Sequence, residues 1–119
     1  MRPLAALLLA MLAACATARP VSMREIRARG ADESRAVTGL QMLFTLQMSY
    51  QAQHGRFATT IDELREVGFS DADFAGSYRP LVTDPGNRLC VAMLPTGERR
   101  PAWSMDGQGL AYRGARCGR

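Results

Sequence analysis

The chain offers few side chains that could perform acid–base or nucleophilic chemistry, and its single histidine is the first to consider. His54 would have to act as the general base for a serine or a cysteine, because there is no other imidazole. No nucleophile elbow, phosphate-binding loop, haem motif or nucleotide fingerprint accompanies it. We therefore predict that His54 caps a helix or lies on the surface, that the protein is not an enzyme, and that it binds no cofactor.

Acidic side chains form a second group with possible chemistry. Five carboxylates lie close together in the sequence, at Asp62, Glu63, Glu66, Asp71 and Asp73. They could be mistaken for a catalytic or metal-binding cluster, but Arg65 lies among them, and a solvated helix face produces the same pattern. We expect the solvated face and predict no metal site.

The cysteines carry the third possible chemistry. If Cys15 is lipidated or removed, Cys90 and Cys117 remain as the only pair, and an oxidising compartment would join them. The chain-entropy model gives about 3.5 kcal/mol for closing a loop of about 28 residues. No C-x-x-C occurs and the spacing fits no zinc-ligand pattern. We predict a structural disulfide between Cys90 and Cys117.

The N-terminal sequence is typical of an export signal. Arg2 precedes an apolar run, Leu4 to Ala14, which is too short to cross a bilayer and ends in small residues. Leu12-Ala13-Ala14-Cys15 resembles the bacterial lipobox, and this resemblance implies a lipid on Cys15 and attachment to a membrane facing the periplasm, with the outer membrane favoured. The alternative is ordinary cleavage after Ala18, at Ala16-Thr17-Ala18, which would release a soluble periplasmic domain.

Length and composition limit the kind of domain that the signal can export. Residues 15–119 suffice for one domain, and we predict a signal peptide over residues 1–18, a tether over 19–31 and a folded domain over 32–119. All fifteen basic residues are arginines, and the net charge is +4. Because no stripe of interleaved basic and aromatic residues is present, we predict no nucleic-acid partner.

The segment from Arg19 to Gly30 is rich in arginine, with only Glu25 opposing. Ser22-Met23-Arg24-Glu25 fits a capping box, so a short helical turn is expected there, ended or loosened by Gly30. We interpret the segment as a flexible tether. The alternative is a basic segment that touches anionic lipid head groups.

The periodicity of the remaining chain predicts an α+β fold. Apolar residues at three- and four-residue spacing predict a long amphipathic helix that begins near Asp32 or Ser34 and ends at Gly55. A second helix is expected over 61–67, capped by Thr59 or Thr60. Beta-prone runs at 77–84, 88–94 and 102–112, separated by turn sequences, predict three or four antiparallel strands. We expect the helices to pack on this small sheet, whose apolar face is predicted to carry Leu89, Val91, Met93 and Trp103.

The order of these parts resembles the globular domain of type IV pilins and type II secretion pseudopilins. The resemblance extends over residues 36–117 and rests on four short segments: Tyr50, His54 to Ala58, Ile61 to Leu64, and the strand region from Val91 to Tyr112. It implies a pilin-like fold and protein partners in an envelope or secretion apparatus. A cysteine pair near the C-terminus also occurs in many pilins.

The chain departs from that family in two respects. The family's peptidase site begins a long apolar helix, whereas here Phe44-Thr45-Leu46-Gln47 comes directly after Leu43 and is succeeded by polar residues, so we interpret the match as accidental. Asp84, Asn87 and Asp106 do not complete the calcium ligand set of major pseudopilins, and we predict no calcium site. The sequence therefore predicts a lipid-anchored accessory or binding module.

Overall fold

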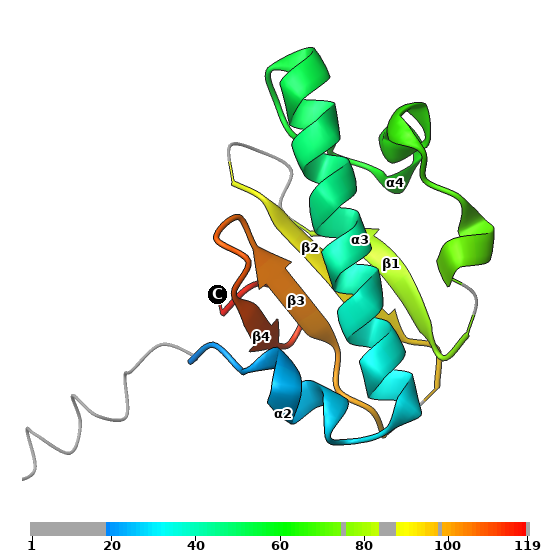
Figure 1. Ribbon diagram of the computed structural model, residues 1–119, viewed down its shortest axis with the longest axis vertical. Helices are drawn as coiled ribbons and strands as arrows, with labels where there is room; N and C mark the ends of the chain where they lie inside the picture. The colour runs from blue at the N-terminus through cyan, green and yellow to red at the C-terminus, as the bar shows by residue number, and fades with distance from the viewer. Residues whose placement is uncertain (1–18, 75, 84–87, 98, 119) are drawn as a thin grey trace, which may run out of the picture.

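The computed structural model describes residues 19–74, 76–83, 88–97 and 99–118. The predicted signal peptide, with the lipidation site Cys15, lies outside the described residues, as do Asp84 and Asn87. The described chain has the predicted α+β architecture, in which one long helix covers a four-stranded antiparallel sheet (Figure 1).

The long helix, α3, spans Ala31–His54. Seven of its residues are buried, at Ala36, Val37, Gly39, Leu40, Leu43, Gln47 and Tyr50, with the three- and four-residue spacing of one helical face. Met48 continues this apolar spacing but is 44% exposed, so not every apolar residue of the pattern packs in the core. Gly39 brings the helix close to the sheet, because a Cβ atom there would lie 2.7 Å from Met93 Cε.

The two ends of α3 differ in how well the sequence predicts them. Gly55 ends the helix in a left-handed conformation with φ of 74°, as expected, and its N–H donates to Gln51 O at 2.8 Å. The start is one residue before Asp32, and Gly30 occupies the capping position without a side-chain hydrogen bond. Asp32 accepts from Ser77 Oγ at 3.2 Å and pairs with Arg100 instead of capping the helix. The helix therefore begins near Asp32, as expected, but Asp32 does not cap it, because a tertiary contact uses the carboxylate.

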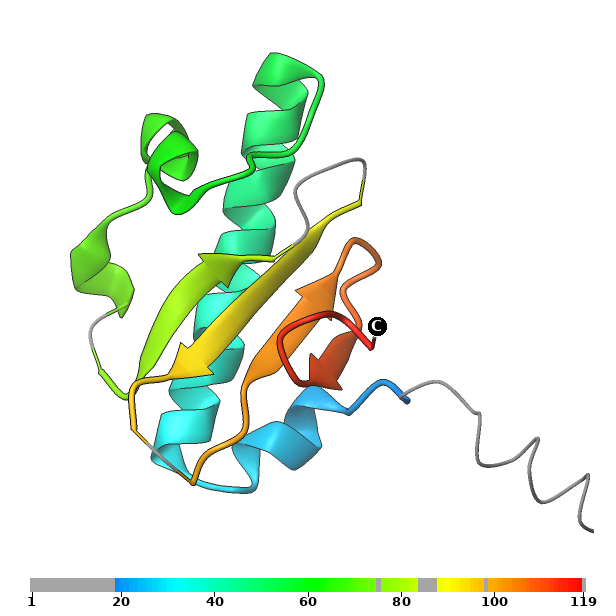
Figure 2. The same cartoon turned by 180° about the vertical axis from the view of Figure 1, so that it is seen from behind.

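The sheet is a meander of four strands in the order β1-β2-β3-β4. The strands are β1 (Tyr78–Val82), β2 (Cys90–Pro95), β3 (Trp103–Asp106) and β4 (Ala111–Arg113). Val91 pairs with Met105, and Met93 with Trp103. All four residues predicted for the apolar face are buried, and α3 lies across that face (Figures 1 and 2).

The C-terminal segment covers part of the opposite face of the sheet. Cys117 is joined to Cys90 by a disulfide, with 6.1 Å between the Cα atoms, and its N–H donates to Ser104 Oγ at 2.9 Å. Ser104 and Ala92, which pair with each other across β2 and β3, are fully buried. Figure 2 shows this segment in red, folded back in front of β3 and β4.

Residues 19–31 are not a flexible tether. The predicted helical turn is present as α2 (Met23–Arg27), and Ser22 Oγ caps it by accepting from Arg24 N at 3.1 Å. Ile26 is fully buried in the core, and Val21 N donates to Ala111 O at 2.6 Å. A buried isoleucine and a backbone bridge hold the segment against the domain, so the folded unit begins at Val21.

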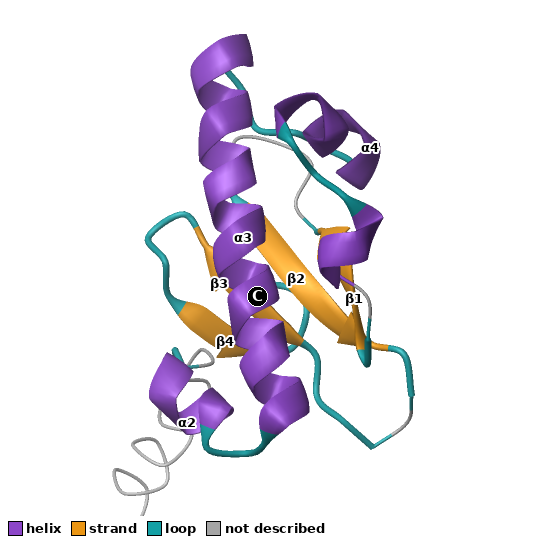
Figure 3. Cartoon of the chain, turned by 45° about the vertical axis from the view of Figure 1, so that its right-hand side comes forward, coloured by secondary structure: helices purple, strands orange, loops and turns teal. Residues whose placement is uncertain are grey.

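The chain between α3 and β1 is built from short helices. α4 (Ile61–Leu64) is capped by Thr60 and continues as the 3-10 helix η1 (Arg65–Val67), which ends at Gly68, so the predicted second helix is confirmed. A further 3-10 helix, η2 (Asp71–Phe74), was not expected. The rings of Phe69 and Phe74 stack at 4.8 Å and join these parts. Figure 3 shows α4 beside the C-terminal half of α3.

Candidate functional site

The turn after α3 is fixed by a buried amide. Gln47, fully buried on the inner face of α3, donates to Ala58 O at 2.9 Å and accepts from Ala58 N at 2.7 Å. Both backbone groups of Ala58, itself buried, are thereby satisfied away from water. This role of Gln47 was not predicted from the sequence, although a glutamine on an apolar helix face was a signal.

Tyr50, Arg56 and Glu63 form a polar network beside this turn. Glu63 accepts from Arg56 NH2 at 2.6 Å, from the Tyr50 hydroxyl at 2.5 Å, and from Thr59 Oγ1 at 2.7 Å. The Arg56 hydrogen bond, together with the weaker effects of those from Tyr50 and Thr59, holds the pKa of Glu63 far below its ordinary value. The Glu63 hydrogen bond in turn raises the pKa of Tyr50. Because its lone pairs are engaged, this carboxylate stabilises the turn rather than offering a free base.

His54 lies at the end of α3 and contacts this network. Its ring stacks on Tyr50 with 4.1 Å between centroids, and its Nε2 lies 3.0 Å from Glu66 Oε2. The side chains of His54 and Glu66 are 37% and 59% exposed. A histidine and a carboxylate are two parts of an acid–base relay, but in the part of the chain that the structure describes no serine, threonine or cysteine side chain bonds to this imidazole.

The acidic residues after α3 are largely tied to basic partners. Arg65 Nε lies 3.1 Å from Asp62 Oδ1, and Arg65 NH1 lies 3.0 Å from Asp71 Oδ2. The Arg65 hydrogen bond lowers the pKa of Asp71. Within the described ranges no three histidine, cysteine or acidic side chains are grouped as ligands for a metal ion. These contacts are those of an ion-paired surface.

Asp106, the described member of the compared calcium set, is used within its own turn. Its Oδ1 accepts from Gln108 N at 2.9 Å and Leu110 N at 3.0 Å, and its Oδ2 accepts from the Tyr112 hydroxyl at 3.0 Å. This last hydrogen bond raises the pKa of Tyr112. The side chain shapes the predicted turn between β3 and β4.

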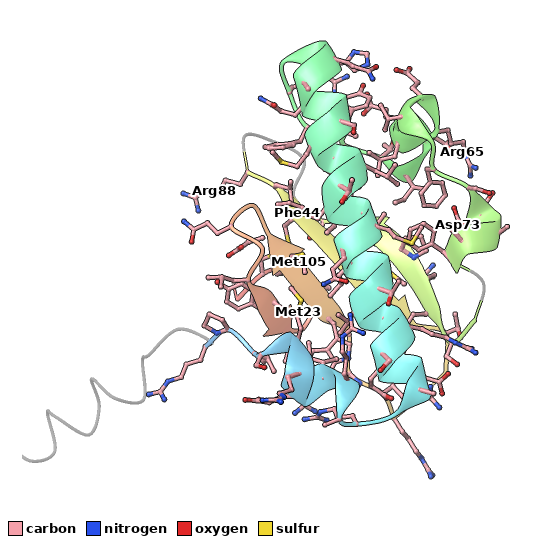
Figure 4. All side chains as sticks on the ribbon, viewed as in Figure 1. Met23, Phe44, Arg65, Asp73, Arg88 and Met105 are labelled. Carbon is pink, nitrogen blue, oxygen red and sulfur yellow. A yellow bond between two sulfur atoms is a disulfide. The ribbon has the colours of Figure 1, made fainter. Side chains whose placement is uncertain are left out.

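A groove lies between α3 and the short helices. It consists of two hollows of about 340 and 350 Å³, which share Thr38 and Asp73 and which we call the α3 groove. Figure 4 shows Asp73 beside α3, on the segment that forms the opposite wall. The first hollow is lined by Ser34, Arg35, Thr38, Gly39, Asp73, Phe74, Ser77, Tyr78 and Met93. The second is lined by Thr38, Gln41, Met42, Thr45, Leu46, Gly68 and Asp73.

The lining of the α3 groove is suited to binding. Methionine and leucine side chains supply an adaptable apolar surface, at Met42, Leu46 and Met93. Threonine hydroxyls and opposite charges from Arg35 and Asp73 stand at its rim. The volume of each hollow accommodates a few side chains of a docked segment. The groove could not be predicted from the sequence, because η2, which supplies one wall, was not among the expected elements.

None of the described helices combines the length and apolarity needed to cross a bilayer. No protein-family model, curated protein or solved structure matches the chain.

Proposed function

We propose that this chain is a non-enzymatic, exported binding module that is anchored to a membrane by a lipid on Cys15 and acts as an accessory of the cell envelope or of a secretion or pilus system. The observation that carries the binding role is the α3 groove, which is apolar in its walls and polar at its rim. Its protein partner would be a component of that apparatus.

The proposed relationship to pilins and pseudopilins rests on the order of the structural elements along the chain. A long helix, a fixed turn, a short helix, an antiparallel meander and a C-terminal disulfide succeed one another as in that family. The residues quoted for the resemblance have physical roles in this chain: Tyr50 and Arg56 bond to Glu63, and Gly55 ends α3. In the proposed protein the lipid replaces the apolar helix that fixes pilins in the membrane.

The non-enzymatic assignment rests on how the polar groups are engaged. The Glu63 carboxylate accepts from three side chains, and Asp62 and Asp71 both bond to Arg65. His54 contacts the carboxylate of Glu66, and both side chains are exposed to solvent. Such groups hold their neighbours in place and leave little capacity to bind and activate a substrate.

The anchoring is tested by mass spectrometry of the full chain purified from bacterial membranes, beside the Cys15→Ala variant. We expect a diacyl or triacyl mass on Cys15 that the variant lacks. A chain that begins at Arg19 and fractionates without detergent would overturn the anchor and leave the alternative, a soluble periplasmic interaction domain with no link to pili or secretion.

The binding role is tested by a photo-reactive amino acid placed at Thr45, in the α3 groove, in living cells. The matched control places it at Arg79, which is exposed on β1 and lies outside the groove. We expect a crosslink to an envelope protein from position 45 only, identified by mass spectrometry as a secretion or pilus component. Equal crosslinking from both positions would contradict the groove as the binding site.

A further inference from the structure

Helix α2 presents arginines on a fixed surface. Ile26 is buried beneath the helix, while Arg24 and Arg27 on its flanks are exposed. Arg27 NH2 lies 3.4 Å from Gln41 Oε1 on α3, so its side chain extends along the outside of the domain. Because the helix is anchored, these cations keep a defined position relative to the rest of the domain.

Other elements bring further arginines to the same end of the molecule. The Arg29 guanidinium lies 5.3 Å from the centre of the Trp103 ring, and Arg113 pairs with Trp103 across β3 and β4. Arg100, from the connection between β2 and β3, forms an ion pair with Asp32 at the start of α3. We call this surface the basic end. Its arginines are Arg24, Arg27, Arg29, Arg100 and Arg113.

Few carboxylates balance the basic end. Among the residues that the structure describes they are Glu25, Asp32 and Glu33, and Asp32 is already paired with Arg100. Near the opposite end of α3 acidic side chains outnumber basic ones, since Asp62, Glu63 and Glu66 of α4 and η1 lie there with Arg56 and Arg65. Figure 1 shows the two ends, with α2 at the foot of α3 and α4 near its top.

We propose that the basic end lies flat against an anionic lipid surface. The inference rests in part on the proposed anchor: Val21, which pairs with β4, comes six positions after Cys15, and this stretch of chain spans at most about 20 Å. A lipid on Cys15 therefore holds α2 close to the head groups. Guanidinium groups donate paired hydrogen bonds to phosphate oxygens, and a nearby anionic surface attracts each of them.

This orientation determines how helix α3 and the α3 groove are placed relative to the membrane. Helix α3 begins at the basic end and rises about 36 Å over its length. The acidic end is then directed away from the membrane, and the α3 groove opens along the side of the upright helix, accessible to a protein partner.

The experiment measures binding of the full chain, with Cys15→Ser to remove any lipid, to vesicles of phosphatidylcholine with and without about 30% phosphatidylglycerol, enough to give a strongly negative surface. The readout is the partition coefficient on vesicles with phosphatidylglycerol divided by that on vesicles without it. Apolar insertion of residues 4–14 contributes equally to both coefficients and therefore cancels in this ratio. Wild type is compared with Arg24→Gln/Arg27→Gln and with the matched control Arg88→Gln/Arg116→Gln, which removes two arginines elsewhere on the domain.

At low salt we expect the α2 variant to lower this ratio by about 25-fold, which is about fivefold for each arginine, and the control to change it much less. Raising the salt to about 300 mM should lower the wild-type ratio towards that of the variant. Equal ratios for the two variants, or a wild-type ratio of one, would overturn the basic end as a lipid-facing surface. The acyl mass on Cys15 is a separate result, so failure of the anchor and failure of this surface are distinguishable.

Discussion

Gln47 shows how one polar side chain fixes a turn. Its amide hydrogen-bonds both the N–H and the carbonyl oxygen of Ala58. Because Ala58 is buried, water cannot replace these two hydrogen bonds. A residue of similar size without an amide would fill the same space but leave a donor and an acceptor unsatisfied. The free-energy cost then comes from desolvated backbone groups rather than from lost packing.

We therefore expect Gln47→Leu to lower the free energy of unfolding by roughly 3 kcal/mol, measured by urea denaturation. Gln53→Leu, on an exposed position of the same helix, is the matched control and should change it by less than about 0.5 kcal/mol. Equal effects of the two substitutions would contradict the role assigned to the buried amide.

The Glu63 network predicts a dependence of stability on pH. Its Arg56 hydrogen bond lowers the pKa of Glu63 below the ordinary value of 4.5, so the folded protein keeps the charge at pH values where the unfolded chain binds a proton. The stabilisation is present above about pH 4.5 and is lost as the pH falls through the folded-state pKa. Asp32 and Asp71, whose pKa values are lowered by Arg100 and Arg65, act in the same direction.

We expect the free energy of unfolding, measured in urea from about pH 7 to about pH 2.5, to fall in the acid range. Glu63→Gln should reduce this slope, because the variant has no proton to bind at that position. An unchanged slope in the variant would show that other carboxylates carry the dependence.

Among the elements, α2 was predicted as a helical turn, but its packing against the domain was not predicted. The long helix, the second helix and the strands were predictable because their apolar residues repeat at regular spacing and their ends carry glycine, threonine or turn sequences. α2 contributes a single buried residue, Ile26, in an arginine-rich segment, and one residue makes no periodic pattern. The α3 groove was missed for a related reason, since its wall depends on the four-residue helix η2.

The contribution of α2 to the fold is measurable. Ile26→Ala should lower the free energy of unfolding by about 3 kcal/mol, because it removes a fully buried side chain from the core. Arg24→Ala, on the same helix but exposed, serves as the control and should have little effect. A neutral Ile26→Ala would indicate that this segment is a tether after all.

For the molecule as a whole, the disulfide joins the last residues to the middle of the sheet. Cys90 and Cys117 are both buried, and the segment between them contains β3 and β4. Replacing both cysteines by alanine should lower the free energy of unfolding by roughly 3.5 kcal/mol, as the chain-entropy model gives for a loop of this length. Comparison of the double variant with wild type, under oxidising and reducing conditions, checks this value. If reduction leaves wild-type stability unchanged, the link does not constrain the unfolded chain.

The shortest strand, β4, is held by both extremes of the folded chain. Val21 pairs with Ala111 at one edge, and the segment that ends at Cys117 folds back over the sheet after this strand. The first residues of the fold thus find their partner only at Ala111, near the other end of the fold. The domain consequently cannot close while the segment from Ala111 to Cys117 is still in a ribosome or a translocation channel, so that segment must emerge before the domain folds.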